Sequence, residues 1–407
     1  MKTLALYARI GLRNIRRNAR RSLFTIAAIS FGLFSLIVFQ ALKVGLHKEM
    51  VSGTLGLDAG TIQVHAAGFE ANMALIQPIP EMDKVRSGLA GLKLTDFSER
   101  IKSPALVLAG RKSSAIMLAG IQPAEEKKVT FINRRVVEGD YLAEADRVLL
   151  GRPLAESLGV RPGDEVVLMA QSMYGRPVTR KFVIGGLYQT DLPSFDRSHA
   201  YLPLPAAQRF LDAEDVVTEI ALHTDPEQAP GLAAGLQQRL GPATWQVRPW
   251  QRTVPDLVQL IALNDATMRL LIVIVFAIVA MGITNTMTTV IFERFREFGI
   301  LNAIGAGPGG IVSLVILESF FLGAIATGLG SLAGLAAGLY LQHYGIDLTR
   351  FISTNQYFAA GHVLRAYVTP GDLLNAVLIT LATAIAAGIY PAWKAANMDP
   401  VKALVHN

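Results

Sequence analysis

The sequence predicts an α-helical membrane protein with four transmembrane helices and a large α+β domain between the first and the second of them. Three observations lead to this prediction. Four apolar stretches with at most one charge are each long enough to cross the hydrocarbon layer, which takes about 20 residues. Residues 47–265, between the first two stretches, alternate between strand and helix patterns. Finally, 51% of the residues are hydrophobic and only 17% are charged, which is too apolar for an ordinary soluble protein.

The chain begins with a basic segment, because residues 1–21 contain seven Lys or Arg and no acid. Its pattern predicts an amphipathic helix on the inner leaflet, and a purely orienting basic flank is the alternative. Residues 22–46 form the first span. Their apolar run exceeds the 7–15 residues typical of a signal peptide, so we expect the segment to remain as an anchor. The positive-inside rule then places both termini in the cytoplasm.

Residues 47–265 are expected to form an extracytoplasmic domain. The expected strands are 61–65, 105–108, 115–121, 165–169, 181–184 and 218–223, and the expected helices are 81–92, 153–158, 205–211 and 227–240. The stretch from Val148 to Asp164 indicates a strand, a two-turn helix that ends at Gly159, and a tight turn. Residues 173–178 are predicted to form the tip between two strands, since Gly-Arg-Pro breaks both flanking patterns.

The remaining chain is predicted to cross the membrane three more times. The expected segments are a span at 266–292, a cytoplasmic hairpin helix at 293–310, a span at 311–341, an extracytoplasmic loop at 342–371, a span at 372–393 and a cytoplasmic tail at 394–407. The helical pattern of 254–263 continues into the second span as a long rod. Five glycines in the third span are expected to allow close helix packing: Gly323, Gly328, Gly330, Gly334 and Gly338.

The most informative motif is the charged segment from Glu293 to Ala306, which reads Glu-Arg-Phe-Arg-Glu-Phe-Gly-Ile-Leu-Asn-Ala-Ile-Gly-Ala. Its apolar residues recur near the helical period, so it is either an amphipathic helix at the membrane surface or a solvated turn that joins two spans. The motif resembles the signature of FtsX-like, MacB-type permeases of ATP-binding-cassette systems. The tail from Tyr390 to Leu404 and the element from Val148 to Asp164 are also similar to patterns of that family. Asn302 departs from the basic residue often found at its position.

The resemblance implies that this segment is a coupling helix that docks on a separate cytoplasmic ATPase dimer. The residues it assigns to coupling are Glu293, Arg294, Arg296, Glu297, Phe298, Gly299, Leu301, Ala303 and Gly305. ATP and Mg would be bound by the partner ATPase, and no cofactor is expected in this chain. Glu318, the only charge in the third span, is expected to face the bundle, a polar partner or the inner interface, with a role in ATP-linked movement as the alternative.

Several classes of function lack their motifs in this sequence. There is no Gly-x-x-x-x-Gly-Lys-Ser/Thr, no His-Glu-x-x-His and no Gly-x-Ser-x-Gly, and cysteine is absent. We therefore expect no catalytic residues and no metal site, and a non-enzymatic subunit. The net charge of +6 arises beside the predicted spans, so nucleic acid is not an expected partner.

Three functions fit a permease of this kind: release of lipoproteins from a bacterial inner membrane, export of drugs or peptides in a tripartite pump, and signalling to a cell-wall hydrolase. In the resembled family the exporter branch commonly carries its ATPase on the same chain, and the signalling branch has a smaller external domain, which favours lipoprotein release. The expected partners are then a second copy or a paralogous permease, a lipoprotein, a periplasmic carrier and membrane lipids. Acyl chains would contact Phe31, Phe34, Ile37 and Val38 on the first span and Leu271, Ile274, Val275 and Ile278 on the second. The carrier would contact Met173, Tyr174, Arg176 and Pro177.

Overall fold

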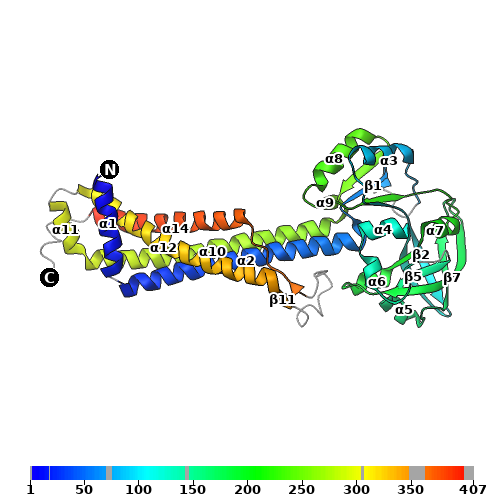
Figure 1. The fold of residues 1–407 in the computed structure, drawn as a ribbon, viewed down its shortest axis with the longest axis horizontal. Coiled ribbons are helices and arrows are strands. Elements are labelled where there is room, and N and C mark those ends of the chain that lie inside the picture. The colour runs from blue at the N-terminus through cyan, green and yellow to red at the C-terminus, as the bar shows by residue number, and fades with distance from the viewer. Residues whose placement is uncertain are drawn as a thin grey trace. The chain divides into compact units, whose positions relative to one another are not determined.

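The computed structural model describes residues 2–17, 19–69, 76–142, 146–303, 307–347 and 363–397 (Figure 1). The chain divides into two compact units. The helical unit contains residues 1–47, 261–347 and 363–407, and the α+β unit contains residues 48–260 and 348–362. Two of the long helices, α2 (Ala19–Thr54) and α10 (Pro255–Glu293), contribute residues to both units.

The helical unit contains the four predicted spans. Its helices are α1 (Lys2–Arg17), α2, α10, α11 (Phe295–Ala303), α12 (Gly307–Tyr344) and α14 (Pro370–Ala396), and a short ladder joins β11 (Ile346–Asp347) to β12 (Val363–Leu364). Helices α2, α10, α12 and α14 are long and apolar enough to cross a membrane, and their apolar residues surround each helix rather than forming one stripe. The predicted rod is confirmed, because α10 is one continuous helix from Pro255 to Glu293.

Small residues of α12 let the spans approach one another. An added Cβ would lie 3.0 Å or less from a neighbouring atom at four of its glycines: Gly323, Gly330, Gly334 and Gly338. At Gly330 that neighbour is the carbonyl oxygen of Ser30 on α2, so the two backbones nearly touch. The prediction of close helix packing is confirmed for Gly323, Gly330 and Gly334, whose added Cβ would meet α14 or α2, whereas at Gly338 it would meet Val368, which precedes α14. It is wrong for Gly328, whose added Cβ would meet open space.

The α+β unit is built on a ten-stranded sheet. Its strands are β1 (Ile62–Ala66), β2 (Phe97–Ala109), β3 (Lys112–Ile121), β4 (Val136–Gly139), β5 (Arg147–Gly151), β6 (Glu165–Gln171), β7 (Pro177–Tyr188), β8 (His199–Pro203), β9 (Glu219–Leu222) and β10 (Trp245–Pro249). Its helical segments are η1 (Leu55–Ala59), α3 (Met82–Gly91), α4 (Pro123–Val129), η3 (Ile132–Arg135), α5 (Arg152–Leu158), α6 (Pro193–Ser198), α7 (Leu204–Phe210), α8 (Ala229–Leu240) and α9 (Trp250–Thr253).

Six of the strands close into a ring in the order β2, β3, β8, β5, β7, β6 and back to β2. A hydrophobic core with residues from all six strands fills this ring, and α5 and α7 add side chains to it. Strands β9, β1 and β10 extend the sheet from β2 and pack with α3 and α8 around a second core. The unit therefore has two cores joined through β2.

The sequence predicted the longer elements of this unit correctly. Each expected strand lies in or overlaps β1, β2, β3, β6, β7 or β9, and each expected helix overlaps α3, α5, α7 or α8. The predicted end of α5 is also confirmed, because Gly159 has a φ of 78° and its N–H bonds back to Ala155. Strands β4, β8 and β10 were missed, since each is at most five residues long and lies beside a helix or a turn that breaks the alternation.

Candidate functional site

The charged motif forms a sharp junction between two helices. Helix α10 ends at Glu293, Arg294 occupies the turn, and α11 begins at Phe295. The N–H of Arg294 bonds to the carbonyl oxygens of Val290 and Ile291, and the N–H of Phe298 bonds to the carbonyl oxygen of Arg294. Because hydrogen bonding continues through the turn, α11 is tied directly to the end of α10.

Arg294 points into the helical unit and is only 5% exposed. Its Nη1 donates to Oε2 of Glu318 on α12 at 3.2 Å, and its Nε donates to Oε2 of Glu297 at 2.7 Å. The guanidinium also lies 5.1 Å from the ring centre of Phe298. Asn14 of α1 donates to the same oxygen of Glu318 at 3.5 Å. The expectation that Glu318 has a polar partner in the bundle is confirmed.

Helices α1 and α2 each contribute one further ion pair to this junction. Arg17 donates to Oε1 of Glu297 at 2.5 Å, and Arg21, at the start of α2, donates to Oε2 of Glu293 at 2.8 Å. Burial raises the pKa of the Glu297 carboxyl, but hydrogen bonds from Arg294 and Arg17 outweigh it and lower the pKa below its ordinary value. Glu297 therefore stays ionised between two cations. We call the set Asn14, Arg17, Arg21, Glu293, Arg294, Glu297 and Glu318 the α11 junction.

The motif residues divide between an inner and an outer face. Phe298 is 2% exposed and packs with Ile311 and Ala392 in one hydrophobic cluster, and Gly299 is also buried. Arg296 is exposed, and so is Ile300, which the sequence analysis did not single out. Leu301 is half-buried. An outer partner can therefore reach Arg296 and Ile300, while the buried motif residues hold α11 on the bundle.

The structure does not describe the side chains at two of the expected coupling positions. Gly305 lies outside the described residues. Ala303 is the last residue of α11, and its side chain is outside the description. The aromatic residues expected in the loop after the third span, from Phe351 to Phe358, and the tail from residue 398 onward are also outside it.

The eight expected acyl-contact residues do not share one environment. Four are widely exposed within the helical unit: Phe31, Leu271, Ile274 and Ile278. Phe34, Val38 and Val275 are half-buried. Ile37 is the exception, because it is 4% exposed and its side chain would lie 3.0 Å from a Cβ added at Gly334. Ile37 therefore packs against α12, and an acyl chain cannot reach it on the exposed face.

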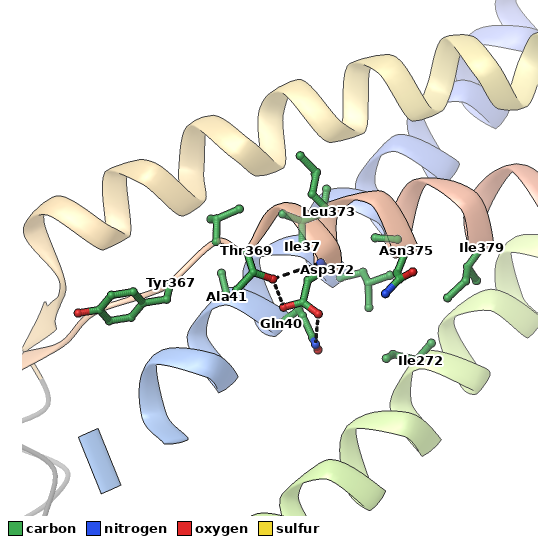
Figure 2. Close-up of a pocket in the computed structure, with 13 residues that line it drawn as sticks. Ile37, Gln40, Ala41, Ile272, Tyr367, Thr369, Asp372, Leu373, Asn375 and Ile379 are labelled. Atoms are coloured by element: carbon green, nitrogen blue, oxygen red, sulfur yellow. Dashed lines mark hydrogen bonds between the residues drawn. The ribbon is translucent and has the colours of Figure 1, made fainter. Parts of the chain in front are cut away.

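A small pocket of about 180 Å³ lies next to Ile37 and is walled by α2, α10 and α14 (Figure 2). Asp372 is the acidic group in it. One oxygen of this carboxylate accepts a hydrogen bond from Gln40 at 3.2 Å, and the other accepts from the hydroxyl of Thr369 at 2.5 Å. Thr369 in turn accepts from the N–H of Asp372 and caps α14. This carboxylate is occupied by structural hydrogen bonds.

The expected hairpin tip is present between β6 and β7. The N–H of Ser172 bonds to the carbonyl oxygen of Arg176, and Gly175 has a φ of 77° in the turn. Tyr174 is 68% exposed and Met173 is 37% exposed, so the tip presents apolar surface. Beside it lies an open groove of about 450 Å³, lined mainly by apolar residues of β2, β3 and β6 and by Pro177.

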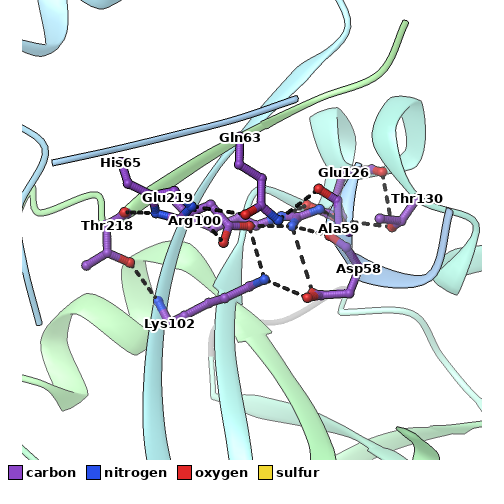
Figure 3. Close-up of polar contacts among 10 residues, drawn as sticks. All are labelled: Asp58, Ala59, Gln63, His65, Arg100, Lys102, Glu126, Thr130, Thr218 and Glu219. Carbon is purple, nitrogen blue, oxygen red and sulfur yellow. Dashed lines mark hydrogen bonds and ion pairs between the residues drawn. The ribbon is translucent and has the colours of Figure 1, made fainter. Parts of the chain in front are cut away.

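A second ionic cluster, which the sequence analysis did not find, lies inside the α+β unit (Figure 3). Arg100 of β2 is 1% exposed and donates twice to Glu126 of α4, at 3.0 and 2.6 Å. It also donates to Glu219 of β9 at 2.7 Å and to the carbonyl oxygen of Asp58 at 2.6 Å. Lys102 pairs with Asp58 at 2.7 Å and with Glu219 at 3.0 Å. We call Asp58, Arg100, Lys102, Glu126 and Glu219 the Arg100 cluster.

The Arg100 cluster holds the end of a long helix. Asp58 lies in η1, which follows α2 directly, so the cluster fixes the last turn of that helix to β2 and β9. No signal in the sequence pointed to this cluster. A charged residue in a strand is ordinarily exposed, and Glu219 lies 119 positions from Arg100 in the sequence.

Comparison with known proteins identifies the family. Residues 22–239 match the model of the MacB-like periplasmic core domain, and residues 269–400 match the FtsX-like permease C-terminal model. The lipoprotein-releasing system transmembrane protein LolC of Xylella fastidiosa is 26% identical, with 97% of each chain covered. LolE of Haemophilus influenzae is 24% identical, with 94% of this chain and 93% of that one covered.

A third relative has a different layout. The macrolide export ATP-binding/permease protein MacB 1/2 of Paracoccus denitrificans is 24% identical over 98% of this chain but only 58% of its own length. The two family models together cover residues 22–239 and 269–400, which include most of the α+β unit and the motif from Glu293 to Ala306. The chain belongs to the FtsX-like permeases with a MacB-like periplasmic core domain, which are permease subunits of ABC transporters.

Proposed function

We propose that this permease releases lipoproteins from the bacterial inner membrane, driven by ATP hydrolysis on a separate cytoplasmic ATPase dimer. The observation that carries the proposal is the near full-length similarity to LolC, over 97% of both chains, together with an exposed apolar face on the first two spans. In this arrangement α11 and both termini lie in the cytoplasm, and the α+β unit lies outside.

The α11 junction supplies the coupling step. The ATPase would contact the outer face of α11, at Arg296 and Ile300. Arg294 and Glu318 then transmit the movement of α11 to α12. Leaving one partner of a buried ion pair without the other typically costs about 3–5 kcal/mol, so the two residues should move together. The half-exposed pairs made by Arg17 of α1 and Arg21 of α2 are weaker, so they can rearrange during the cycle.

The acyl anchor would bind on the exposed face of the first two spans. Phe31, Leu271, Ile274 and Ile278 form this face with the half-buried Phe34, Val38 and Val275. Each buried CH₂ group is worth about 0.8 kcal/mol, so a multi-acyl anchor needs an apolar receptor and an energy-driven step to leave it. A second copy or a paralogue would cover the opposite side of the anchor.

The hairpin tip and its groove would receive the periplasmic carrier. Tyr174 and Met173 offer apolar contacts, and the guanidinium of Arg176 lies 5.8 Å from the ring centre of Tyr174, which helps to hold that ring in place. Exposed aromatic and Met side chains beside an apolar groove are common in surfaces that bind another protein.

The test is ATP-dependent transfer of a triacylated lipoprotein to a soluble carrier by the permease reconstituted with its ATPase in proteoliposomes. Ile278→Gln places a polar group on the proposed acyl face and should reduce transfer severalfold. Leu332→Gln is the matched control, since Leu332 is 69% exposed against 65% for Ile278 but lies on α12.

A separate pair of variants tests the ATPase contact. Arg296→Glu should weaken co-purification of the ATPase, while Arg20→Glu, an exposed charge reversal outside α11, should not. If the unmodified complex transfers no lipoprotein and a small amphipathic drug stimulates its ATPase activity, the proposed function changes from lipoprotein release to drug export.

A further inference from the structure

An open cavity of the α+β unit has basic walls. It measures about 740 Å³, which is large enough for a small-molecule ligand. Five cationic side chains line it, against three carboxylates: the cations are Lys93, Lys127, Lys128, Arg134 and Arg135, and the carboxylates are Glu49, Asp96 and Asp225. It is separate from the α11 junction, the acyl face and the hairpin groove.

The cations come from three different elements and converge on one space. Lys93 follows the end of α3 and has a φ of 55°, Lys127 lies in the last turn of α4, and Arg134 lies in η3. All three are exposed, and within the described part of the chain none of them has a carboxylate partner. Lys127 has only the ring of Tyr141 beside it, 5.5 Å from the ring centre.

Three other charged groups at the cavity are already engaged. Lys128 pairs with Glu125 at 2.6 Å, and Arg135 pairs with Asp191 at 2.7 Å. The Asp225 carboxylate accepts hydrogen bonds from the Glu227 N–H and the Gln228 side chain at the start of α8. The cations without a carboxylate partner in the described residues are Lys93, Lys127 and Arg134, and the carboxylates of Glu49 and Asp96 line the cavity beside them.

One wall of the cavity is the end of the first membrane helix. Glu49, Ser52 and Gly53 line it, and they lie three to seven residues beyond residue 46, where the predicted span ends. A helix rises 1.5 Å per residue, so these three residues lie about 5–10 Å beyond the predicted end of the span. The headgroup layer on each side of the hydrocarbon is about 5–8 Å thick. Lysine and arginine side chains reach several more ångströms toward such a layer.

We propose that this cavity binds the phosphate-bearing headgroup of an anionic membrane phospholipid. Unpaired Lys and Arg groups supply the charge that a phosphodiester requires, and Arg can form paired hydrogen bonds to its oxygens. Thr95 and Thr224 line the same space and offer hydroxyl groups. A lipid bound there would contact the end of α2, α4 and η3 together.

The test measures binding of short-chain lipids to the full-length permease in detergent by native mass spectrometry and calorimetry. Dihexanoylphosphatidylglycerol should bind, and dihexanoylphosphatidylcholine, which carries no net charge, should bind at least tenfold more weakly. The triple variant Lys93→Gln, Lys127→Gln, Arg134→Gln should lose phosphatidylglycerol binding by tenfold or more, since each cation near an anionic surface contributes about fivefold.

The matched control removes three exposed cations of the same unit outside the cavity, with Lys112→Gln, Lys181→Gln and Arg209→Gln. It should bind phosphatidylglycerol as the unmodified protein does. All six positions are exposed, so both triple variants should unfold at the temperature of the parent. Equal binding of the two lipids, or unchanged binding by the cavity variant, overturns the proposal. Inorganic phosphate that binds as tightly as phosphatidylglycerol overturns its lipid assignment.

Discussion

The α11 junction and the Arg100 cluster both use buried arginine, but they differ in how completely their charges are enclosed. Arg100 is 1% exposed, and its partners Glu126 and Glu219 are also buried. Among the charged residues of the α11 junction only Arg294 and Glu318 are buried, while the side chains of Arg17 and Glu297 are 55% and 42% exposed. A fully enclosed cluster is expensive to open, whereas a half-exposed one exchanges its partners with water.

This difference suits two mechanical roles. The Arg100 cluster fixes the end of α2 to two strands, so that segment and sheet move as one body. The α11 junction combines one firm contact, to α12, with two adjustable ones, in which Arg17 of α1 pairs with α11 and Arg21 of α2 pairs with the end of α10. The predictions below separate the two sites by the size and the kind of effect.

The largest effect is expected for Arg100→Met. It leaves Glu126 and Glu219 buried without their main cation, and loss of one partner from a buried ion pair costs about 3–5 kcal/mol. Pulse proteolysis of the full-length protein in urea should show the α+β unit cleaved at much lower denaturant. Lys181→Met breaks the exposed pair with Glu165 and is the control, with an expected cost of less than about 1 kcal/mol. Equal effects of the two substitutions would contradict the assigned difference.

A functional effect is expected from Glu318→Leu, which leaves Arg294 buried without its partner on α12. ATPase activity of the complex should persist, while transport per ATP falls about tenfold or more, because α11 no longer moves α12. The double variant Arg294→Met, Glu318→Leu removes both charges. It should recover stability, since apolar replacement of a buried pair is often neutral, but it should not recover coupling. Restored transport in the double variant would show that the pair serves stability alone.

Acid should destabilise the α+β unit. Burial lowers the pKa of His65 below the ordinary 6.5, against the opposing effects of Glu219 and of a hydrogen bond to the carbonyl oxygen of Thr218. The folded state therefore keeps His65 neutral while the unfolded chain binds a proton, so stability is complete above pH 6.5 and declines below it. Burial would raise the pKa of Glu219, but Lys102 and Arg100 lower it below 4.5, so its contribution is lost only in stronger acid.

Pulse proteolysis at pH 8 and pH 5 measures this decline. His65→Gln should reduce the difference in stability between the two pH values, since glutamine does not titrate. Part of the difference should remain, because burial also lowers the pKa of His199. An unchanged pH dependence in His65→Gln would exclude His65 as a source.

The smallest effect is expected for the pair Arg17 and Glu297, which is half-exposed. A double-mutant cycle with Arg17→Gln and Glu297→Gln should give a coupling free energy of about 0.2–1 kcal/mol, and less at high salt. Thermal unfolding of the permease at two ionic strengths measures it. A coupling of several kcal/mol would mean that the α11 junction is as rigid as the Arg100 cluster.

The sequence by itself determined the features that depend on local pattern. Long uncharged runs predict spans because hydrocarbon excludes charge, as α2, α10, α12 and α14 illustrate. Gly159 predicts the end of α5 because the left-handed cap favours glycine. The motif from Glu293 to Ala306 likewise located a helix between two spans.

The tertiary structure alone decided which residues meet. Arg294 and Arg296 are two positions apart in one charged motif, yet the first is buried on Glu318 and the second is exposed, because Arg294 lies in the turn that faces α12 and Arg296 lies on the outer face of α11. In the sequence Ile37 cannot be distinguished from its apolar neighbours. In the structure it packs in the bundle, in the space left because Gly334 has no side chain. Arg100 meets Glu219 across 119 positions only because β2 and β9 pair in the sheet. The local sequence pattern determines where helices and strands form. Packing between elements that are distant in the sequence determines which charged side chains are buried, because a buried charge needs a partner.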